Sequence, residues 1–292
     1  MSGFLDDALH LIRPKHWLKN VFVLMPLPFA LAAGSHFDLV AFGIGLMAMC
    51  AANSSVYVFN DCWDANRDKL HPKKKYRPVA AGRVSRVRAM MMSAALCGLS
   101  LLLAWITARL LVLPIVLSYL VLQVFYCLRG KQFPLVDVFL LSSGFVLRVL
   151  LGCALVMASP SSWLLLCSSS FALFLALAKR RADLVQGVDT EHRPSLAGYS
   201  QGFLDQALAV SAGLTVMAYA LYCMDAKVLI PGREFASLPF VVFGVMEYLR
   251  IIQKIDTGES PVDLWLSSRS LISCGVAWIV AILFSVRLPT PF

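Results

Sequence analysis

Residues 38–68 read DLVAFGIGLMAMCAANSSVYVFNDCWDANRD, an apolar run that ends in a row of acids. Residues 38–60 are long enough to cross a bilayer, for which about 20 apolar residues are needed. The acids that follow are Asp61, Asp64 and Asp68, and on a helix this spacing places them on one face. The stretch therefore predicts a transmembrane helix with three like charges aligned at its end.

The composition of the whole chain is also typical of a membrane protein. Of its 292 residues, 59% are hydrophobic and 15% are charged, and the mean hydropathy is +0.74. Soluble domains hold about 45–50% apolar and about 25% charged residues, so the chain is read as an integral membrane protein. The eight cysteines are scattered without metal-ligand spacing, which predicts neither disulfides nor a zinc site. The net charge of +9 is typical of cytoplasmic membrane loops, so we expect no nucleic-acid partner.

Apolar runs predict the membrane-spanning helices. They lie near residues 20–35, 38–60, 88–107, 109–128, 134–157, 161–178, 205–224, 236–250 and 270–288. The first and the eighth are short and contain proline, and the long, partly acidic region before the first favours a retained helix over a cleaved signal peptide. The predicted fold class is all-α: a polytopic membrane bundle of about nine transmembrane helices, formed as a single domain over residues 1–292.

Charge placement predicts the orientation of these helices. With the N-terminus in the cytoplasm, 21 of the 26 lysines and arginines fall on the cytoplasmic side, four fall opposite, and Arg148 lies inside a helix. Because positive residues collect on the cytoplasmic side, we expect a multi-pass protein of the inner (plasma) membrane with a central cavity open to the cytosol. Long charged loops at 60–83 and 179–203 lie four helices apart, which indicates two four-helix halves plus one helix.

The acidic row and the basic loop after it have two readings each. The row is either a solvated face or a metal site; a solvated face does not explain acids at a helix C-terminal end, where negative charge is disfavoured. Mg²⁺ is usually held by one or two carboxylates and substrate phosphates, so the functional reading is a Mg²⁺-bridged diphosphate. Lys74 and Arg77 either set the topology or close over a phosphorylated substrate.

Single polar residues inside the bundle leave further alternatives open. Arg148 costs about 2.5–3.5 kcal/mol to insert near the bilayer centre, so it should face the bundle interior, either in an ion pair with Asp137 or against a substrate. Tyr126 and Lys131 are substrate ligands or interfacial anchors. The polar positions of residues 53–57 either join helices by hydrogen bonds or line a cavity.

The motif Asn60-Asp61-x-x-Asp64-x-x-x-Asp68 resembles the first aspartate-rich motif of the UbiA superfamily of intramembrane prenyltransferases. Other stretches are similar to its decaprenyl-phosphate phosphoribosyltransferase branch. They are Arg13-Pro14-Lys15-His16-Trp17-Leu18-Lys19-Asn20, His71-Pro72 through Lys74 to Tyr76-Arg77-Pro78 and Gly82, Asp137 through Gly144-Phe145-Val146-Leu147-Arg148, Lys179-Arg180-Arg181, Arg193-Pro194 with Gly198-Tyr199-Ser200, and Phe203-Leu204-Asp205-Gln206. These stretches span most of the chain in order.

The resemblance implies transfer of 5-phosphoribose from phosphoribosyl diphosphate (PRPP) to a polyprenyl phosphate of the decaprenyl or undecaprenyl kind. The lipid-linked product would be a cell-wall precursor for arabinofuranose-type glycans. We expect Asp61, Asp64 and Asp68 to hold Mg²⁺ and to act in catalysis with Lys19 and Arg77. The residues expected to bind substrate are Asn60, Lys74, Tyr126, Lys131, Arg148, Lys179, Arg180 and Asp183. The expected partners are PRPP, the polyprenyl phosphate and the bilayer, and a homo-oligomer is left open.

The sequence departs from the family pattern at three places. The second loop has Asp183 and Asp189 where the aromatic prenyltransferases have Asp-x-x-x-Asp, Ser268 stands where an aspartate is expected before Arg269, and Gly130 replaces a bulkier residue. Two alternatives remain: a UbiA-type transferase that moves a prenyl group from a prenyl diphosphate to an aromatic acceptor, and a non-enzymatic membrane transporter.

Overall fold

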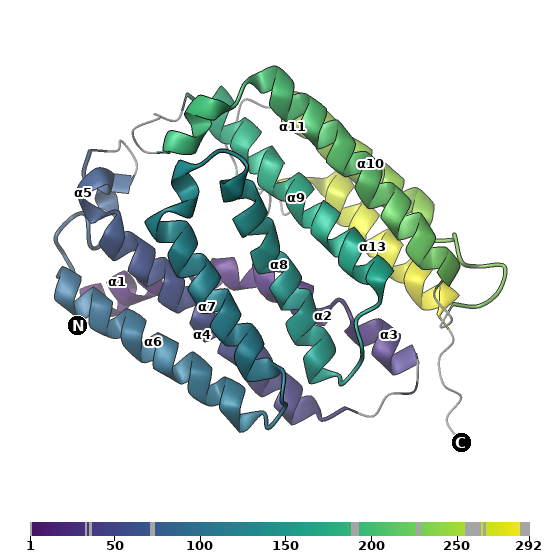
Figure 1. Ribbon diagram of the computed structural model, residues 1–292, viewed down its shortest axis with the longest axis horizontal. Coiled ribbons are helices and arrows are strands. Elements are labelled where there is room, and N and C mark those ends of the chain that lie inside the picture. Colours follow the sequence, from purple (N-terminus) through teal and green to yellow (C-terminus); the bar gives the residue numbers. More distant parts are fainter. Residues whose placement is uncertain are drawn as a thin grey trace.

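The computed structural model describes residues 2–32, 34, 37–70, 74–187, 193–225, 229–254, 264 and 267–286. These ranges are helical apart from their turns and one isolated bridge between Leu229 and Val286, so the predicted all-α class is confirmed for them (Figure 1). His71-Pro72 and Asp189, named above, lie outside the described residues, as do Lys227 and Arg287, two of the charges placed opposite the cytoplasm.

Five described helices are long and apolar enough to cross a membrane. They are α4 (Leu39–Trp63), α6 (Arg86–Ile106), α8 (Val136–Leu155), α9 (Ser162–Val185) and α10 (Gln201–Asp225). Two shorter apolar helices, α7 (Val112–Leu128) and α13 (Arg269–Ser285), accompany them, and α11 (Leu238–Lys254) packs between α10 and α13. The protein is therefore a multi-pass membrane protein.

The first predicted span is interrupted rather than continuous. The chain forms α1 (Ser2–Ile12), the 3₁₀ helix η1 (Pro14–Asn20), α2 (Val21–Leu24) and α3 (Leu27–Ala32) in succession. The break between α2 and α3 contains Pro26, and Pro28 follows two residues later. Proline lacks an amide donor and disfavours helical geometry in the residue before it, so a single helix over residues 20–35 was the wrong expectation.

Side-chain caps mark where several helices begin. Asp38 accepts hydrogen bonds from the amides of Val40 and Ala41 at the start of α4, at 2.8 and 3.1 Å. Ser85 and Ser161 accept from the third amide of α6 and α9 in the same way. Such caps satisfy amides that have no partner within the helix and contribute about 1 kcal/mol each.

The two largest buried apolar cores divide the bundle, and α8 and α2 belong to both. One core unites α4, α6 and α7, and the other unites α9, α10, α11 and α13. Figure 1 shows α8 between α7 and α9. On α2, Phe22 enters the second core and Val23 the first, and a Cβ on Gly152 of α8 would meet the Val23 carbonyl at 2.1 Å. The halves therefore meet along α8, with α2 laid directly on its backbone.

The charged helix ends meet at one end of the bundle. Arg86, at the start of α6, donates to Asn66 just after α4, at 2.6 Å. Arg180 near the end of α9 lies 2.9 Å from Asp137 at the start of α8. The end of α4 therefore lies by the start of α6, and the end of α9 lies by the start of α8, as the expected alternation of helix directions requires.

Candidate active site

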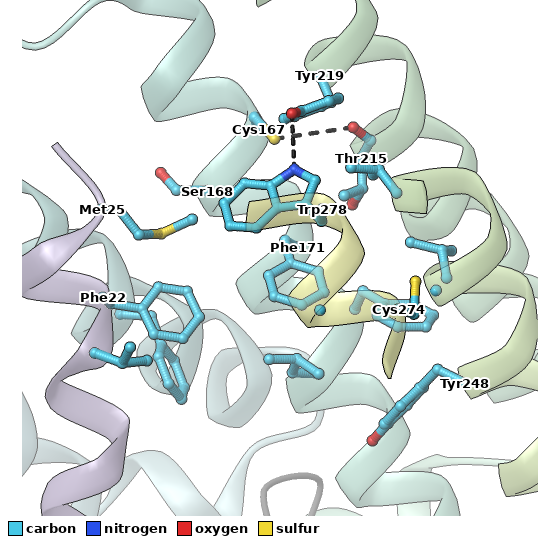
Figure 2. Close-up of a pocket in the computed structure, with 18 of the residues that line it drawn as sticks. Phe22, Met25, Cys167, Ser168, Phe171, Thr215, Tyr219, Tyr248, Cys274 and Trp278 are labelled. Atoms are coloured by element: carbon cyan, nitrogen blue, oxygen red, sulfur yellow. Dashed lines mark hydrogen bonds between the residues drawn. The ribbon is translucent and has the colours of Figure 1, made fainter. Parts of the chain in front are cut away.

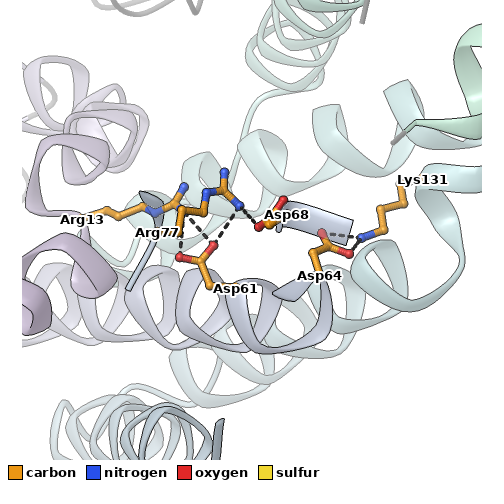
Figure 3. Close-up of polar contacts among 6 residues, drawn as sticks. All are labelled: Arg13, Asp61, Asp64, Asp68, Arg77 and Lys131. Carbon is orange, nitrogen blue, oxygen red and sulfur yellow. Dashed lines mark hydrogen bonds and ion pairs between the residues drawn. The ribbon is translucent and has the colours of Figure 1, made fainter. Parts of the chain in front are cut away.

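The acidic row lies where α4 bends into α5 (Ala65–Asp68). The helix ends at Trp63, and Asp64 has helical φ and ψ of −86° and −1°, while its amide still donates to the Asn60 carbonyl at 2.9 Å. Because of the bend, the three carboxylates do not form one straight row. Asp61 and Asp68 converge on one side, and Asp64 points elsewhere (Figure 3).

Two arginines neutralise Asp61 and Asp68. Arg77 Nη1 donates to Asp61 Oδ1 at 3.1 Å and to Asp68 Oδ2 at 2.7 Å, so one guanidinium bridges both acids (Figure 3). Arg13 Nη2 lies 2.7 and 2.9 Å from the two Asp61 oxygens. Both carboxylates are buried, and burial raises the pKa of the Asp68 carboxyl more than Arg77 and Lys74 lower it. The guanidinium groups therefore offset a large desolvation cost.

Lys131 neutralises the third acid. Its ammonium lies 2.5 and 2.7 Å from the two oxygens of Asp64 (Figure 3). Lys131 belongs to the short 3₁₀ helix η3 (Gly130–Gln132), and a Cβ on Gly130 would meet the Leu140 side chain at 2.3 Å. The glycine thus leaves room for Leu140, which explains why this sequence departs from the bulkier residue of the family.

Arg13 was absent from the predicted site residues, although it lies in a stretch quoted for the resemblance. Its backbone adopts the left-handed region, with φ 54° and ψ 62°, between α1 and η1. This conformation is unfavourable for a residue with a side chain, and such strain concentrates at functional sites. The Arg13–Asp61 contact joins residues 48 positions apart, so only the tertiary fold reveals it.

The three acids suit a magnesium ion by their chemistry. Carboxylate oxygens are ligands that Mg²⁺ prefers, and one or two suffice when substrate phosphates complete the shell. Across the described ranges, however, no three acidic, histidine or cysteine side chains are grouped to hold a metal by themselves. Arg77 stands between Asp61 and Asp68 instead, so the protein's own cation occupies the place of a bridging ion. The donor set fits a shared site with phosphate better than an all-protein cage.

A second ionic cluster joins α9, α8 and the second loop. Arg180 Nε lies 2.9 Å from Asp137, Arg180 Nη1 donates to Asp183 at 2.8 Å, and Arg193 also pairs with Asp183. Tyr126 of α7 accepts from Arg180 Nη2 at 3.4 Å. The predicted residues Tyr126, Arg180 and Asp183 are therefore brought together, and Arg193 is a member that the prediction missed.

Asp137 is the buried centre of that cluster. It is fully buried and accepts hydrogen bonds from Ser195 at 2.8 Å and Tyr199 at 2.7 Å, both in or beside the 3₁₀ helix η4 (Pro194–Gly198). Burial raises the pKa of the Tyr199 hydroxyl, as does its bond to Asp137. Because Asp137 is committed to Arg180, the predicted ion pair between Arg148 and Asp137 is wrong.

Three lysines, Lys19, Lys74 and Lys179, are coupled electrostatically to one another or to the acids of both clusters. Lys74, in the 3₁₀ helix η2 (Lys74–Tyr76), interacts electrostatically with Asp68 and Asp64 of the first loop and with Asp183 of the second. Burial lowers the pKa of the Lys74 ammonium, and Arg77 lowers it further. Lys179 interacts electrostatically with Lys19, Lys74, Arg180 and Asp183. Positive groups held close together in this way favour an anion between them.

The polar residues of α4 join helices. Ser54 donates to the Ile12 carbonyl at 2.9 Å, Ser55 donates to the Ser93 carbonyl at 2.8 Å, and Asn53 donates to the His16 carbonyl at 3.3 Å. Of the two readings left open for this segment, interhelical hydrogen bonding is therefore confirmed for Asn53, Ser54 and Ser55. Tyr57, one turn nearer the acidic row, accepts from Lys19 Nζ at 3.0 Å.

Lys19 lines an apolar cavity of about 460 Å³. Its walls come from η1, α2 and α8 on one side and from α9, α10, α11 and α13 on the other, and Figure 2 shows Phe22, Phe171 and Trp278 among the side chains that surround it. Trp278 Nε1 donates to Tyr219 OH at 2.8 Å in the C-terminal half of α10 (Figure 2). Among the lining residues Lys19 is the one charged side chain, so the cavity suits an apolar chain with an anionic head.

Ser268, the third departure from the family pattern, has a structural role in this fold. Its hydroxyl caps α13 by accepting from the Leu271 amide at 3.4 Å. Serine and aspartate are both preferred caps, so the replacement preserves the start of the helix.

Comparisons with known proteins agree with this geometry. The UbiA prenyltransferase family model matches residues 20–261. The chain is 31% identical to a decaprenyl-phosphate phosphoribosyltransferase of Corynebacterium glutamicum over 98% of its length and 89% of that protein, and 31% identical to one of Mycobacterium tuberculosis over 96% and 94%. A UbiA homolog from Archaeoglobus fulgidus, solved bound to GPP and Mg²⁺, has a TM-score of 0.72 at 20% identity and covers 95% of this chain and 97% of its own. The chain belongs to the UbiA prenyltransferase family, and its near-full-length relatives include the family's decaprenyl-phosphate phosphoribosyltransferases.

Proposed function

We propose that this protein transfers the 5-phosphoribosyl group from PRPP to a polyprenyl phosphate and releases diphosphate. The observation that carries the proposal is the position of Lys19. It lines the apolar cavity, and its ammonium reaches Tyr57 OH at 3.0 Å, beside the Arg13–Asp61 pair. A site for an apolar chain and a site for phosphates therefore meet at one cation. Relatives that carry the name of this activity over nearly the whole chain support the same choice.

The donor site of this proposal is the acidic row with its cations. Asp61, Asp64 and Asp68 would hold Mg²⁺, which when bound would neutralise charge on the departing diphosphate. Arg77 is a bidentate donor suited to phosphate, and Lys74 supplies a point charge beside it. Arg77 already bridges Asp61 and Asp68, and Lys74 interacts electrostatically with Asp64 and Asp68, so a diphosphate placed there would meet both cations without a large movement of the backbone.

The acceptor site is the cavity and its mouth. The polyprenyl chain would pack among the aromatic and aliphatic walls, where burial of each methylene contributes about 0.8 kcal/mol. Its phosphate would then lie by Lys19. Lys179 interacts electrostatically with Lys19, so its positive charge would also attract the phosphate. This arrangement would place the lipid phosphate beside the donor, on the side of the membrane that we expect to face the cytoplasm.

The chemistry then needs little from a general base. A phosphate oxygen of the acceptor is already ionised at neutral pH and forms the new bond to C1 of ribose, while the C1–O bond to diphosphate breaks and diphosphate leaves with the electron pair. Attack from the face opposite the leaving group gives inversion at C1. The side chains contribute by bringing two anions together in a fixed orientation and by stabilising charge.

The strongest rival is transfer of a prenyl group from a prenyl diphosphate to an aromatic acceptor, since that reaction uses the same fold. Purified protein should be given PRPP with a polyprenyl phosphate, or a prenyl diphosphate with an aromatic acid, each with Mg²⁺. We expect a polyprenyl-phosphoryl-phosphoribose product, identified by mass spectrometry, in the first mixture alone. Product in the second mixture alone would replace this proposal with the rival.

The non-enzymatic alternative, a membrane transporter, is separated by the same experiment. Its expected mark is ionisable residues at the bilayer midplane, whereas the ion pairs described above cluster at one end of the bundle. Failure of both mixtures in protein that remains folded would favour it.

A further inference from the structure

Arg148 is a buried cation whose described contacts are all with neutral groups of the protein. Its Nε donates to Asn20 Oδ1 at 2.8 Å and its Nη1 donates to the Gly144 carbonyl at 2.8 Å. Its Nη2 donates to Tyr119 OH at 3.0 Å and to Asn53 Oδ1 at 3.4 Å, and its guanidinium lies 4.7 Å from the centre of the Tyr119 ring. The side chain is only 3% exposed, so its donors are used within the bundle rather than presented to a substrate.

Asn20 links this arginine to the N-terminal segment. It is the last residue of η1 and is 2% exposed, and its amide nitrogen also donates to Cys50 Sγ on α4 at 3.1 Å. One side chain thus connects η1 to both α8, through Arg148, and α4. Because a buried polar group that loses its partner is costly, the position of Asn20 is strongly determined by Arg148.

The rest of η1 is docked on α4 by neighbouring contacts. Asn53, which accepts from Arg148, donates to the His16 carbonyl at 3.3 Å. Trp17 Nε1 donates to Ser54 Oγ at 2.8 Å. The segment from residue 14 to residue 20 is therefore held along its length by a network that ends at Arg148.

Both ends of this segment carry cations of the candidate site. Arg13, immediately before η1, pairs with Asp61, and Lys19, next to Asn20, donates to Tyr57 OH and lines the apolar cavity. We propose that Arg148 is a positioning residue: through Asn20 it fixes the register of η1 and so holds Lys19 where the acceptor phosphate binds. This replaces the expectation that Arg148 contacts substrate, and it rests on the proposed function for the identity of the acceptor.

The test is a double-mutant cycle on full-length protein in detergent or nanodiscs. The variants are Arg148→Gln, Asn20→Ala, Lys19→Met and the pair Arg148→Gln/Lys19→Met, assayed with PRPP and a polyprenyl phosphate. We expect each single change to raise the KM for the acceptor about tenfold, the loss typical of one charge-assisted hydrogen bond. The double variant should match Lys19→Met alone, because Arg148 acts through Lys19.

Two further variants separate positioning from other roles. Arg148→Lys keeps the charge but not the planar fork, so we expect it to resemble Arg148→Gln. Ser55→Ala removes a comparable buried hydrogen bond of α4, but to Ser93 of α6 rather than to η1, and should leave the acceptor KM unchanged. Additive effects in the double variant, or recovery of a wild-type KM in Arg148→Lys, would overturn the proposal in favour of direct attraction to substrate.

A second readout does not depend on activity. Hydrogen–deuterium exchange of peptides covering residues 14–24 should speed up in Arg148→Gln and Asn20→Ala, and stay at the wild-type rate in Lys19→Met and Ser55→Ala. Unchanged exchange in both network variants would refute the positioning role even if the chain proved to use another acceptor. Asn20→Ala keeps the test informative if Arg148→Gln does not fold. If wild-type protein makes no product while exchange changes as expected, the proposed function fails and the positioning of η1 stands.

Discussion

Replacing Asp137 by asparagine should destabilise the protein far more than the nearly equal size of the two side chains suggests. Asp137 and Arg180 both have fully buried side chains, and the carboxylate also accepts from Ser195 and Tyr199. Asparagine offers one acceptor oxygen, and its NH₂ group would face one of these donors. The substitution therefore leaves the Arg180 charge partly uncompensated and at least one buried donor without a partner.

The magnitude follows from the burial of the pair. Removing one partner of a buried ion pair costs about 3–5 kcal/mol. Arg180 retains a second carboxylate, Asp183, at 2.8 Å, so we place the loss at the lower end, about 3 kcal/mol. At roughly 2–4 °C per kcal/mol for chains of this order of size, the melting temperature should fall by roughly 6–12 °C.

Thermal unfolding in detergent, followed by fluorescence-detected size exclusion, measures this shift. Asp205→Asn is the matched control, since Asp205 pairs with the adjacent Arg181 at 2.5 Å but its side chain is 36% exposed. Exposed pairs contribute about 0.2–1 kcal/mol, so the control should shift by less than roughly 4 °C. Equal shifts for the two variants would refute the view that burial of the Asp137–Arg180 pair makes it important.

Three further outcomes are expected. Asp61→Ala and Asp64→Ala should each abolish diphosphate release, measured by a coupled pyrophosphatase assay, while the protein still elutes as a folded species; near-normal turnover would remove the metal assignment. Chelation with EDTA should stop the reaction and added Mg²⁺ should restore it, whereas unaltered activity after chelation would contradict the metal dependence. Gly152→Ala should lower the melting temperature because its Cβ would meet the Val23 carbonyl at 2.1 Å, while Gly213→Ala on α10, with nothing within 4 Å, should raise it or leave it unchanged.

Much of the fold could be predicted from local features of the sequence. The lengths of the apolar runs located the long helices, and the charges of the loops between them predicted which helix ends lie on the same side. The spacing of the three acids at the end of α4 singled them out, and the structure pairs Lys131 with Asp64 and Arg77 with Asp68. These features were accessible because each depends on residues close in the sequence or on the average charge of a loop.

Pairings between distant residues were not accessible in the same way. Asp137 faces Arg180 rather than Arg148, and Arg13 reaches Asp61 across 48 positions, because helix packing decides which buried charges meet. The bend at Asp64 also escaped the helical pattern, because the spacing argument treated residues 61–68 as one continuous helix. Pro26 and Pro28, by contrast, do indicate from the sequence that the first apolar run is interrupted.

The helix α2 contributes to both apolar cores, and this has a consequence for how the chain folds during synthesis. Val21–Leu24 is a single short turn that cannot cross a membrane, and its residues Phe22 and Val23 belong to the two different cores that share α8. The contact that seats it, against Gly152, involves a residue made some 130 positions later. That contact can form only after α8 has been made, so we expect α2 to be among the last elements to reach its final place although it is among the first to be translated.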